Sequence, residues 1–316
     1  YLRGRVGGDR YNLLKQGSTP WGTAYQPRGS MNETSSTFKQ YDADVFLGTD
    51  NLQLADGVSL TAFVGVGTTN EKYEAYGVSG SDFIVPFLLN VKNTKNQGSS
   101  YSEWEKQINS AYGSAEIGFM DYAYLTVTAR NDWFSTLSLK NKKAPNNDLY
   151  TSASLSLVLS DALDLGDTVS FLKLRAGYSQ VAGGADSPYA LSLSYGIYGQ
   201  GHLGASLGNI SGGTIPNSEI TPFEKNETEF GMDLRLFDNK LSIDATMYDN
   251  ETLGDIVGVS ASATSGYGSA LANLGNISNK GIELLVKGEI MRTADFAWEA
   301  SVNYTNNTSE VVATND

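Results

Sequence analysis

One stretch decides the fold: Ala123-Tyr124-Leu125-Thr126-Val127-Thr128-Ala129-Arg130-Asn131-Asp132-Trp133-Phe134-Ser135-Thr136-Leu137. In its first seven residues apolar side chains take every second position, and hydroxyl-bearing side chains take the positions between them. Successive side chains of a strand point to opposite faces, so this alternation predicts a strand with one apolar and one polar face. The charges, Arg130 and Asp132, come only at the end of the run.

The same alternation recurs along the chain, and the charges inside the predicted strands keep to the polar parity. The clearest further runs cover residues 171–180, 228–236, 241–248, 282–287 and 296–304. Such runs approach about ten residues, the length that crosses a bilayer at a tilt, whereas strands of soluble sandwiches are usually about five or six residues long. The pattern predicts transmembrane strands with an inner, lumen-facing set of charged side chains: Lys173, Arg175, Glu229, Asp233, Arg235, Glu283 and Lys287.

Composition limits the other classes of protein. No apolar run approaches 18 residues, so a membrane protein with this sequence has to be a barrel. The chain has no cysteine and a single histidine, His202, which argues against disulfide frameworks and most metal or catalytic sites. We therefore expect no enzyme activity, no cofactor and no metal. The net charge of −13 argues against a nucleic acid partner.

The connections between the predicted strands alternate strictly between short and long. Five short turns separate five long polar segments, at residues 11–38, 69–109, 133–148, 181–225 and 253–275. Outer-membrane barrels have short periplasmic turns and long extracellular loops. The chain is therefore predicted to be all-β, with roughly eleven antiparallel spans. We expect these spans to form part of a larger barrel. The chain itself would then be an open, curved sheet with about half of the strands.

Five strings carry a resemblance to a known family. They are 85–94 (VPFLLNVKNT), 124–133 (YLTVTARNDW), 171–183 (FLKLRAGYSQVAG), 220–233 (ITPFEKNETEFGMD) and 273–284 (NLGNISNKGIEL). In this order they resemble the barrel of the SusC/RagA family of TonB-linked outer-membrane transporters of Bacteroidetes. The resemblance covers nearly the whole chain.

The resemblance implies active import across the outer membrane of a Gram-negative bacterium. A nutrient, either a glycan fragment or a peptide, would be captured together with a SusD-like surface lipoprotein that acts as a lid, and TonB would supply the energy. Residues 1–316 would be part of the β-barrel domain. The plug domain, the TonB box and the C-terminal strands of the family are not expected within this sequence.

Two further interpretations of the function stay open. One is a passive outer-membrane porin, and the other is a surface β-sheet binding module. The candidates for contact with a ligand or partner are aromatic residues of the predicted loops: Trp21, Tyr25, Trp104 and Trp133. The alternative for Trp133 is a place in the outer aromatic girdle, next to membrane lipid. The alternative for the lumen-facing charges is pairing with the plug or with water.

Overall fold

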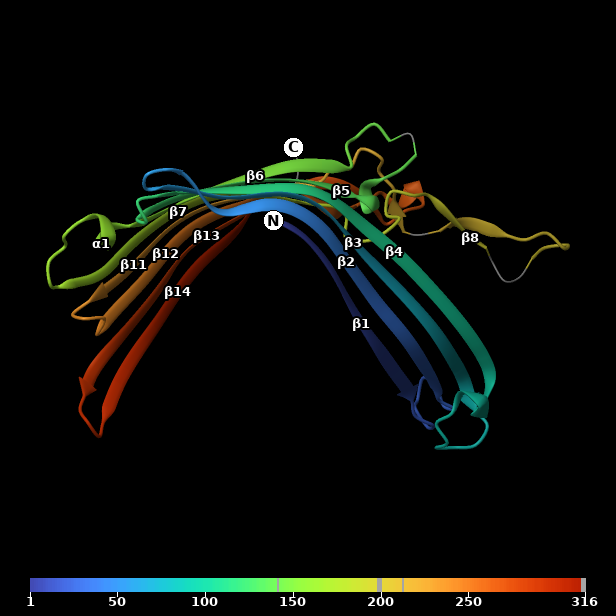
Figure 1. Cartoon of the computed structure of the whole chain (residues 1–316). Coiled ribbons are helices and arrows are strands. Elements are labelled where there is room, and N and C mark those ends of the chain that lie inside the picture. Colours follow the sequence, from blue (N-terminus) through green and yellow to red (C-terminus); the bar gives the residue numbers. More distant parts are fainter. Residues whose placement is uncertain (141, 198–200, 212, 314–316) are drawn as a thin grey trace. The chain divides into compact units, whose positions relative to one another are not determined.

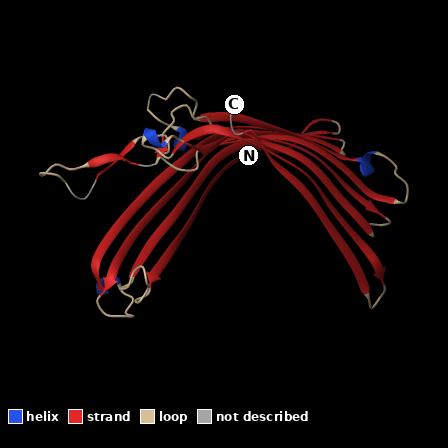
Figure 2. Cartoon of the chain, turned by 180° about the vertical axis from the view of Figure 1, so that it is seen from behind, coloured by secondary structure: helices blue, strands red, loops and turns tan. Residues whose placement is uncertain are grey.

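The computed structural model describes residues 1–140, 142–197, 201–211 and 213–313. Strands make up most of it, and the few helical segments, α1 (Leu159–Ala162), η1 (Val91–Asn93), η2 (Ser135–Leu137) and η3 (Ala263–Ser265), lie in the connections between strands (Figure 2). No helix in the described part is long and apolar enough to cross a membrane. The strands are β1 (Leu2–Thr19), β2 (Ser30–Ala55), β3 (Val58–Phe83), β4 (Thr94–Phe119), β5 (Ala123–Phe134), β6 (Asn147–Val158), β7 (Val169–Gly183), β8 (Ser194–Ile197), β9 (Gly208–Ser211), β10 (Thr214–Ile215), β11 (Phe223–Leu236), β12 (Leu241–Ser260), β13 (Ser269–Arg292) and β14 (Ala297–Ala313).

Twelve of these strands form one sheet in the order β1-β2-β3-β4-β5-β6-β7-β11-β12-β13-β10, with β14 also paired to β13. The long strands β11 to β14 lie side by side with their sequence neighbours (Figure 1), and their pairings are antiparallel. The two-residue β10 pairs in parallel with β13. The prediction of an all-β, antiparallel, open sheet is confirmed: within the described residues β1 and β14 each have one neighbouring strand.

The strand register places the two predicted sets of side chains on opposite faces. Leu234 stands opposite Leu172 on β7 and Ile243 on β12. Asp233, its chain neighbour, stands opposite Lys173 and Asp244. The apolar face, as we call the first, also holds Leu125, Val127, Leu155, Leu174, Met232, Ala245, Leu284, Val286, Val302 and Tyr304. The other face is called the polar face.

The apolar face is exposed in the structure. Phe230 is 53% exposed, Met247 53% and Val302 66%. A soluble monomer rarely leaves a continuous apolar surface of this extent uncovered, because each such residue costs hydration free energy. The apolar face is therefore suited to contact with the hydrocarbon of a membrane.

Three of the predicted long loops are mostly strand, so that part of the prediction is wrong. The segments 11–38 and 69–109 contain the ends of β1, β2, β3 and β4, and the connections shrink to residues 20–29 and 84–93. The segment 253–275 contains the ends of β12 and β13, and its connection shrinks to residues 261–268. β2, β3 and β4 each have 26 residues, well beyond the predicted length. Both faces of the ends of β1 to β4 carry polar side chains, so the alternation that indicates a span is missing there.

The chain forms two compact units. Unit 1 comprises Tyr1–Arg3, Val45–Val66 and Ser110–Asp316, and unit 2 comprises Gly4–Asp44 and Gly67–Asn109. In unit 1 a small core is formed by the segments that follow β5 and β7, with Phe134, Leu137, Ala185, Leu191 and Ile220 buried. The β8–β9 hairpin is a separate two-stranded sheet that stands apart from the large sheet (Figure 1).

Candidate functional site

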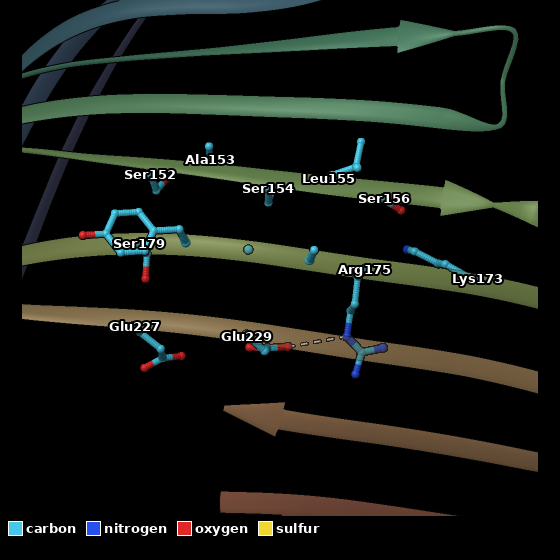
Figure 3. A pocket seen from close by; sticks show the side chains of 13 residues that line it. Ser152, Ala153, Ser154, Leu155, Ser156, Lys173, Arg175, Ser179, Glu227 and Glu229 are labelled. Carbon is cyan, nitrogen blue, oxygen red and sulfur yellow. Dashed lines mark ion pairs between the residues drawn. The ribbon is translucent and has the colours of Figure 1, made fainter. Parts of the chain in front are cut away.

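A cavity of about 370 Å³ lies over β6, β7 and β11 on the polar face (Figure 3). We call it the wall pocket. Its polar lining comes from alternate positions of the three strands, which the register brings to the same face. These residues are Ser152, Ser154, Ser156, Lys173, Arg175, Ser179, Glu227 and Glu229.

Arg175 binds the carboxylates of two neighbouring strands. Its Nη2 donates to Oδ1 of Asp244 at 3.0 Å and to Oγ1 of Thr246 at 2.5 Å, and its Nε lies 3.5 Å from Oε1 of Glu229. The guanidinium reaches β12 across Gly231, where a Cβ atom would lie 2.2 Å from Nε of Arg175. Arg175 thus joins β7, β11 and β12 and has few donors left for a ligand.

Lys173 and Glu227, unlike Arg175, have few charged partners. Within the ranges that the structure describes, Lys173 forms no ion pair, because Asp233 opposite it binds Arg235 at 3.0 Å. In the same part of the chain, the ion-pair partner of Glu227 is Lys225, at 4.0 Å. Figure 3 shows the Lys173 and Glu227 side chains at the two ends of the pocket. An ammonium group and a carboxylate are therefore available for a molecule that occupies it.

The seven predicted lumen-facing charges share one face, as their register shows. Lys173, Arg175 and Glu229 belong to the wall pocket, whereas Asp233 and Arg235 pair with each other beyond it. Glu283 and Lys287 lie on β13, outside the pocket. That this face borders a lumen stays a prediction.

The aromatic candidates do not come together in one site. Trp104 stacks on Tyr73 with 5.6 Å between ring centroids, contacts Phe38 at 6.2 Å, and has Nζ of Lys106 at 5.9 Å. Its ring is thus engaged by neighbouring strands of unit 2, which indicates a structural role. Tyr25 is 82% exposed in the connection 20–29, where Trp21 is partly exposed.

Trp133 lies at the end of β5, at the same parity as Leu125 and Val127 of the apolar face. Its side chain is 40% exposed. This position favours the girdle alternative for Trp133 over ligand contact.

Unit 2 carries charges on both faces of its strands. On one parity of β3, Lys72 lies 2.9 Å from Glu103 and 3.3 Å from Glu74. On the other parity, Glu71 pairs with Lys106 at 3.1 Å. Hydrocarbon would accept neither set, so we assign this part of β3 and β4 to water outside the membrane.

The charge cluster of unit 2 should respond to acid. A hydrogen bond from the Tyr101 hydroxyl, together with Lys72, lowers the pKa of the Glu103 carboxyl below its ordinary value of 4.5. The folded state therefore gains stability from Glu103 above that value, and loses it as the pH falls through the lower folded pKa. Amide hydrogen exchange in residues 70–76 and 100–106, corrected for intrinsic pH dependence, should rise in this window in the wild type. The Glu103→Gln variant should lack the step, and an equal step in both proteins would contradict the assignment.

Sequence reasoning missed a network around Asp132. Its carboxylate, in a residue only 6% exposed, accepts from Nε of Arg130 at 2.9 Å and from the Tyr150 hydroxyl at 2.6 Å. Nη2 of Arg130 donates to Oγ of Ser110 at 2.7 Å, and the guanidinium lies 5.4 Å from the Tyr112 ring centroid. The network joins β4, β5 and β6 where β5 ends. The charges at the end of the 123–137 stretch were the available signal.

Lys142 links the chain segments around the small core of unit 1 by hydrogen bonds. Its Nζ donates to the carbonyl oxygens of Leu137 at 3.0 Å, Pro145 at 3.1 Å and Ile220 at 2.6 Å. Burial lowers the pKa of this ammonium group. Asn273 of β13 also links separate segments, because its Nδ2 donates hydrogen bonds to the carbonyl oxygens of Thr221 and Gly254. The bases of these connections are therefore fixed, and the β8–β9 hairpin is what projects from them.

Comparison with known proteins agrees with this architecture. The family described as "TonB dependent receptor-like, beta-barrel" matches residues 2–316. TonB-dependent receptor P3 of Formosa agariphila is 24% identical over 91% of this chain and 28% of its own length, and receptor P26 is 25% identical over 79% and 25%. The chain thus spans about a quarter of the curated relatives it matches.

Solved structures are similar over nearly all of the chain. The structure described as the RagAB peptide transporter has a TM-score of 0.83 and 20% identity, and covers 99% of this chain and 35% of its own. The siderophore receptor PirA from Pseudomonas aeruginosa has a TM-score of 0.54 and 15% identity, over 99% of this chain and 51% of its own. At these identities the likeness concerns the fold.

Proposed function

Because the chain belongs to the TonB dependent receptor-like β-barrel family, we propose that it forms part of an active importer of a nutrient, either a glycan fragment or a peptide, that works with a SusD-like lipoprotein lid. The family is one of outer-membrane transport proteins rather than enzymes. The observation that carries the proposal is the separation of the two faces. The exposed apolar face suits membrane lipid, and the polar face suits a water-filled path.

The proposal places the lid at the end of the sheet where the long connections lie. The β8–β9 hairpin supports this, because its projecting apolar side chains have little cover: Tyr195 is 69% exposed, Ile197 78% and Leu203 93%. An isolated two-stranded hairpin is only marginally stable in water, so a protein partner would stabilise it. Deletion of the whole segment 181–225 would disturb the fold, because Ile220 belongs to the buried core.

The test uses the complete transporter with residues 193–211 replaced by a short Gly-Ser linker. Nutrient uptake and co-purification of the lid should fall severalfold, while the barrel keeps its resistance to unfolding, because loops tolerate shortening better than spans do. A milder variant, Ile197→Ser with Leu203→Ser, should show the same direction of change. Wild-type uptake and lid binding in both variants, at normal abundance, would contradict the assignment.

Energy dependence separates the importer from a passive porin. Uptake by a TonB-dependent importer should stop when the proton gradient of the inner membrane is collapsed or when TonB is removed. Uptake that continues unchanged under both conditions would favour the porin.

A further inference from the structure

The wall pocket indicates the class of substrate. This inference rests on the proposed import function. We propose that it holds a short peptide with free termini, in an extended conformation along β6 and β7. The N-terminal ammonium of the peptide lies at Glu227 and its C-terminal carboxylate lies at Lys173. Lys173 is one of the predicted lumen-facing charges, and this assignment gives it and Glu227 separate roles.

The charges define the orientation. Arg175 and Glu229 are engaged with each other and with β12, so they contribute little net charge to the pocket. Lys173 and Glu227 stay available for a bound molecule. The ion pair between Glu227 and Lys225 is long, at 4.0 Å. A molecule that satisfies both ends needs an anionic group beside Lys173 and a cationic group beside Glu227.

The spacing defines the length. Glu227 stands opposite Ser179, which follows Lys173 by six positions on β7. Six residues of a strand span about 20 Å, and both flexible side chains can lean toward the middle of the pocket. An extended chain advances about 3.3 to 3.6 Å per residue, so a peptide of about three to six residues fits between the two charges.

The hydroxyl groups between the two charges suit a peptide backbone. Ser154 and Ser156 on β6 are two positions apart, and an extended peptide repeats its backbone groups at the same interval. Ser179 on β7 stands opposite Ser152 of β6 and Glu227 of β11, at the Glu227 end of the pocket. In the described part of the chain, the hydroxyls of Ser154, Ser156 and Ser179 form no hydrogen bond, and each can donate to a carbonyl oxygen and accept from an N–H group.

Other occupants fit less well. A neutral glycan has no charged group for Lys173 or Glu227. An acidic glycan could bind Lys173, but it has no cationic group for Glu227, whose carboxylate would repel it at the other end. A segment of a plug domain could present isolated side-chain charges, and it becomes an outcome of the test.

The experiment measures uptake of isotope-labelled tetra-alanine by cells that carry the complete transporter and its lid. Four forms are compared: both termini free, N-acetylated, C-amidated, and both termini capped. The wild type should take up the free form about three- to tenfold better than either singly capped form. Glu227→Gln should remove the preference for a free N-terminus only, and Lys173→Met should remove the preference for a free C-terminus only. Glu283→Gln and Lys287→Met, on the same face outside the pocket, should change neither preference.

The outcomes separate this inference from the import proposal. Growth of the wild type on oligosaccharides without uptake of any tetra-alanine form would keep the import proposal and overturn the peptide assignment. Peptide uptake that is indifferent to capping would also overturn it. Equal losses for all four forms in Glu227→Gln and Lys173→Met would show that these residues hold a plug or the barrel wall instead. A transporter that supports growth on no nutrient would refute the import proposal itself.

Discussion

Replacing Asp132 with alanine should lower the free energy of unfolding of the complete barrel by roughly 2–4 kcal/mol. The carboxylate accepts from both Arg130 and Tyr150 and is 6% exposed, so its loss leaves a guanidinium and a partly buried hydroxyl without their acceptor. Hydrogen bonds to charged groups contribute about 1.5–3 kcal/mol each, and the remaining groups would recover part of this from water. Urea unfolding in detergent or lipid, followed by the gel mobility of the folded barrel, measures the difference.

The matched control for this experiment is Asp148→Ala. Asp148 stands directly opposite Asp132 in the β5–β6 register, but among the described residues it forms no ion pair or hydrogen bond. Its removal should change the unfolding free energy by less than about 0.5 kcal/mol. Tyr150→Phe should fall between the two, at about 1 kcal/mol, because Arg130 stays bound to the carboxylate. Equal stability of the Asp132 and Asp148 variants would show that the network contributes nothing.

The spans could be predicted from the sequence because lipid and water act on them separately. A strand such as β11 must present Met232 and Leu234 to one medium and Asp233 and Arg235 to the other, so the period of two is written directly in the sequence. The same reasoning failed for β3 beyond Val66. There Lys72 and Glu71 lie on opposite faces, and no medium requires an apolar side.

The candidate site was predicted in outline only. Parity placed Lys173, Arg175 and Glu229 on one face, but it could not show that Gly231 lets Arg175 reach Asp244 across a whole strand. That contact depends on the register between β7, β11 and β12, which no single strand contains. The hydrogen bond from Lys142 to the carbonyl oxygen of Ile220 joins residues 78 positions apart, so no local sequence pattern predicts it. The contacts of Trp104 could not be predicted for the same reason, since Tyr73 and Phe38 approach it from other strands, and its part in ligand contact stays a prediction.

An arginine at Leu284 should cost roughly 2–4 kcal/mol of barrel stability if the site lies near the middle of the membrane. Leu284 stands opposite Ala245 and Tyr304 on the apolar face, where the guanidinium would enter hydrocarbon or distort the bilayer. Leu234→Arg, between Leu172 and Ile243, should cost a similar amount. Equilibrium unfolding of the complete barrel in phospholipid bilayers is the appropriate measurement, because detergent would soften the penalty.

The adjacent leucine provides the sharpest control, because it has the same side chain at nearly the same depth. Leu285 stands opposite Asp244, on the polar face, although simple alternation would give this position a polar residue. Leu285→Arg should therefore cost less than about 1 kcal/mol, since the guanidinium meets water and lies beside a carboxylate. If the two neighbouring substitutions cost the same, the two faces do not border different media, and the assignment of the apolar face to lipid fails.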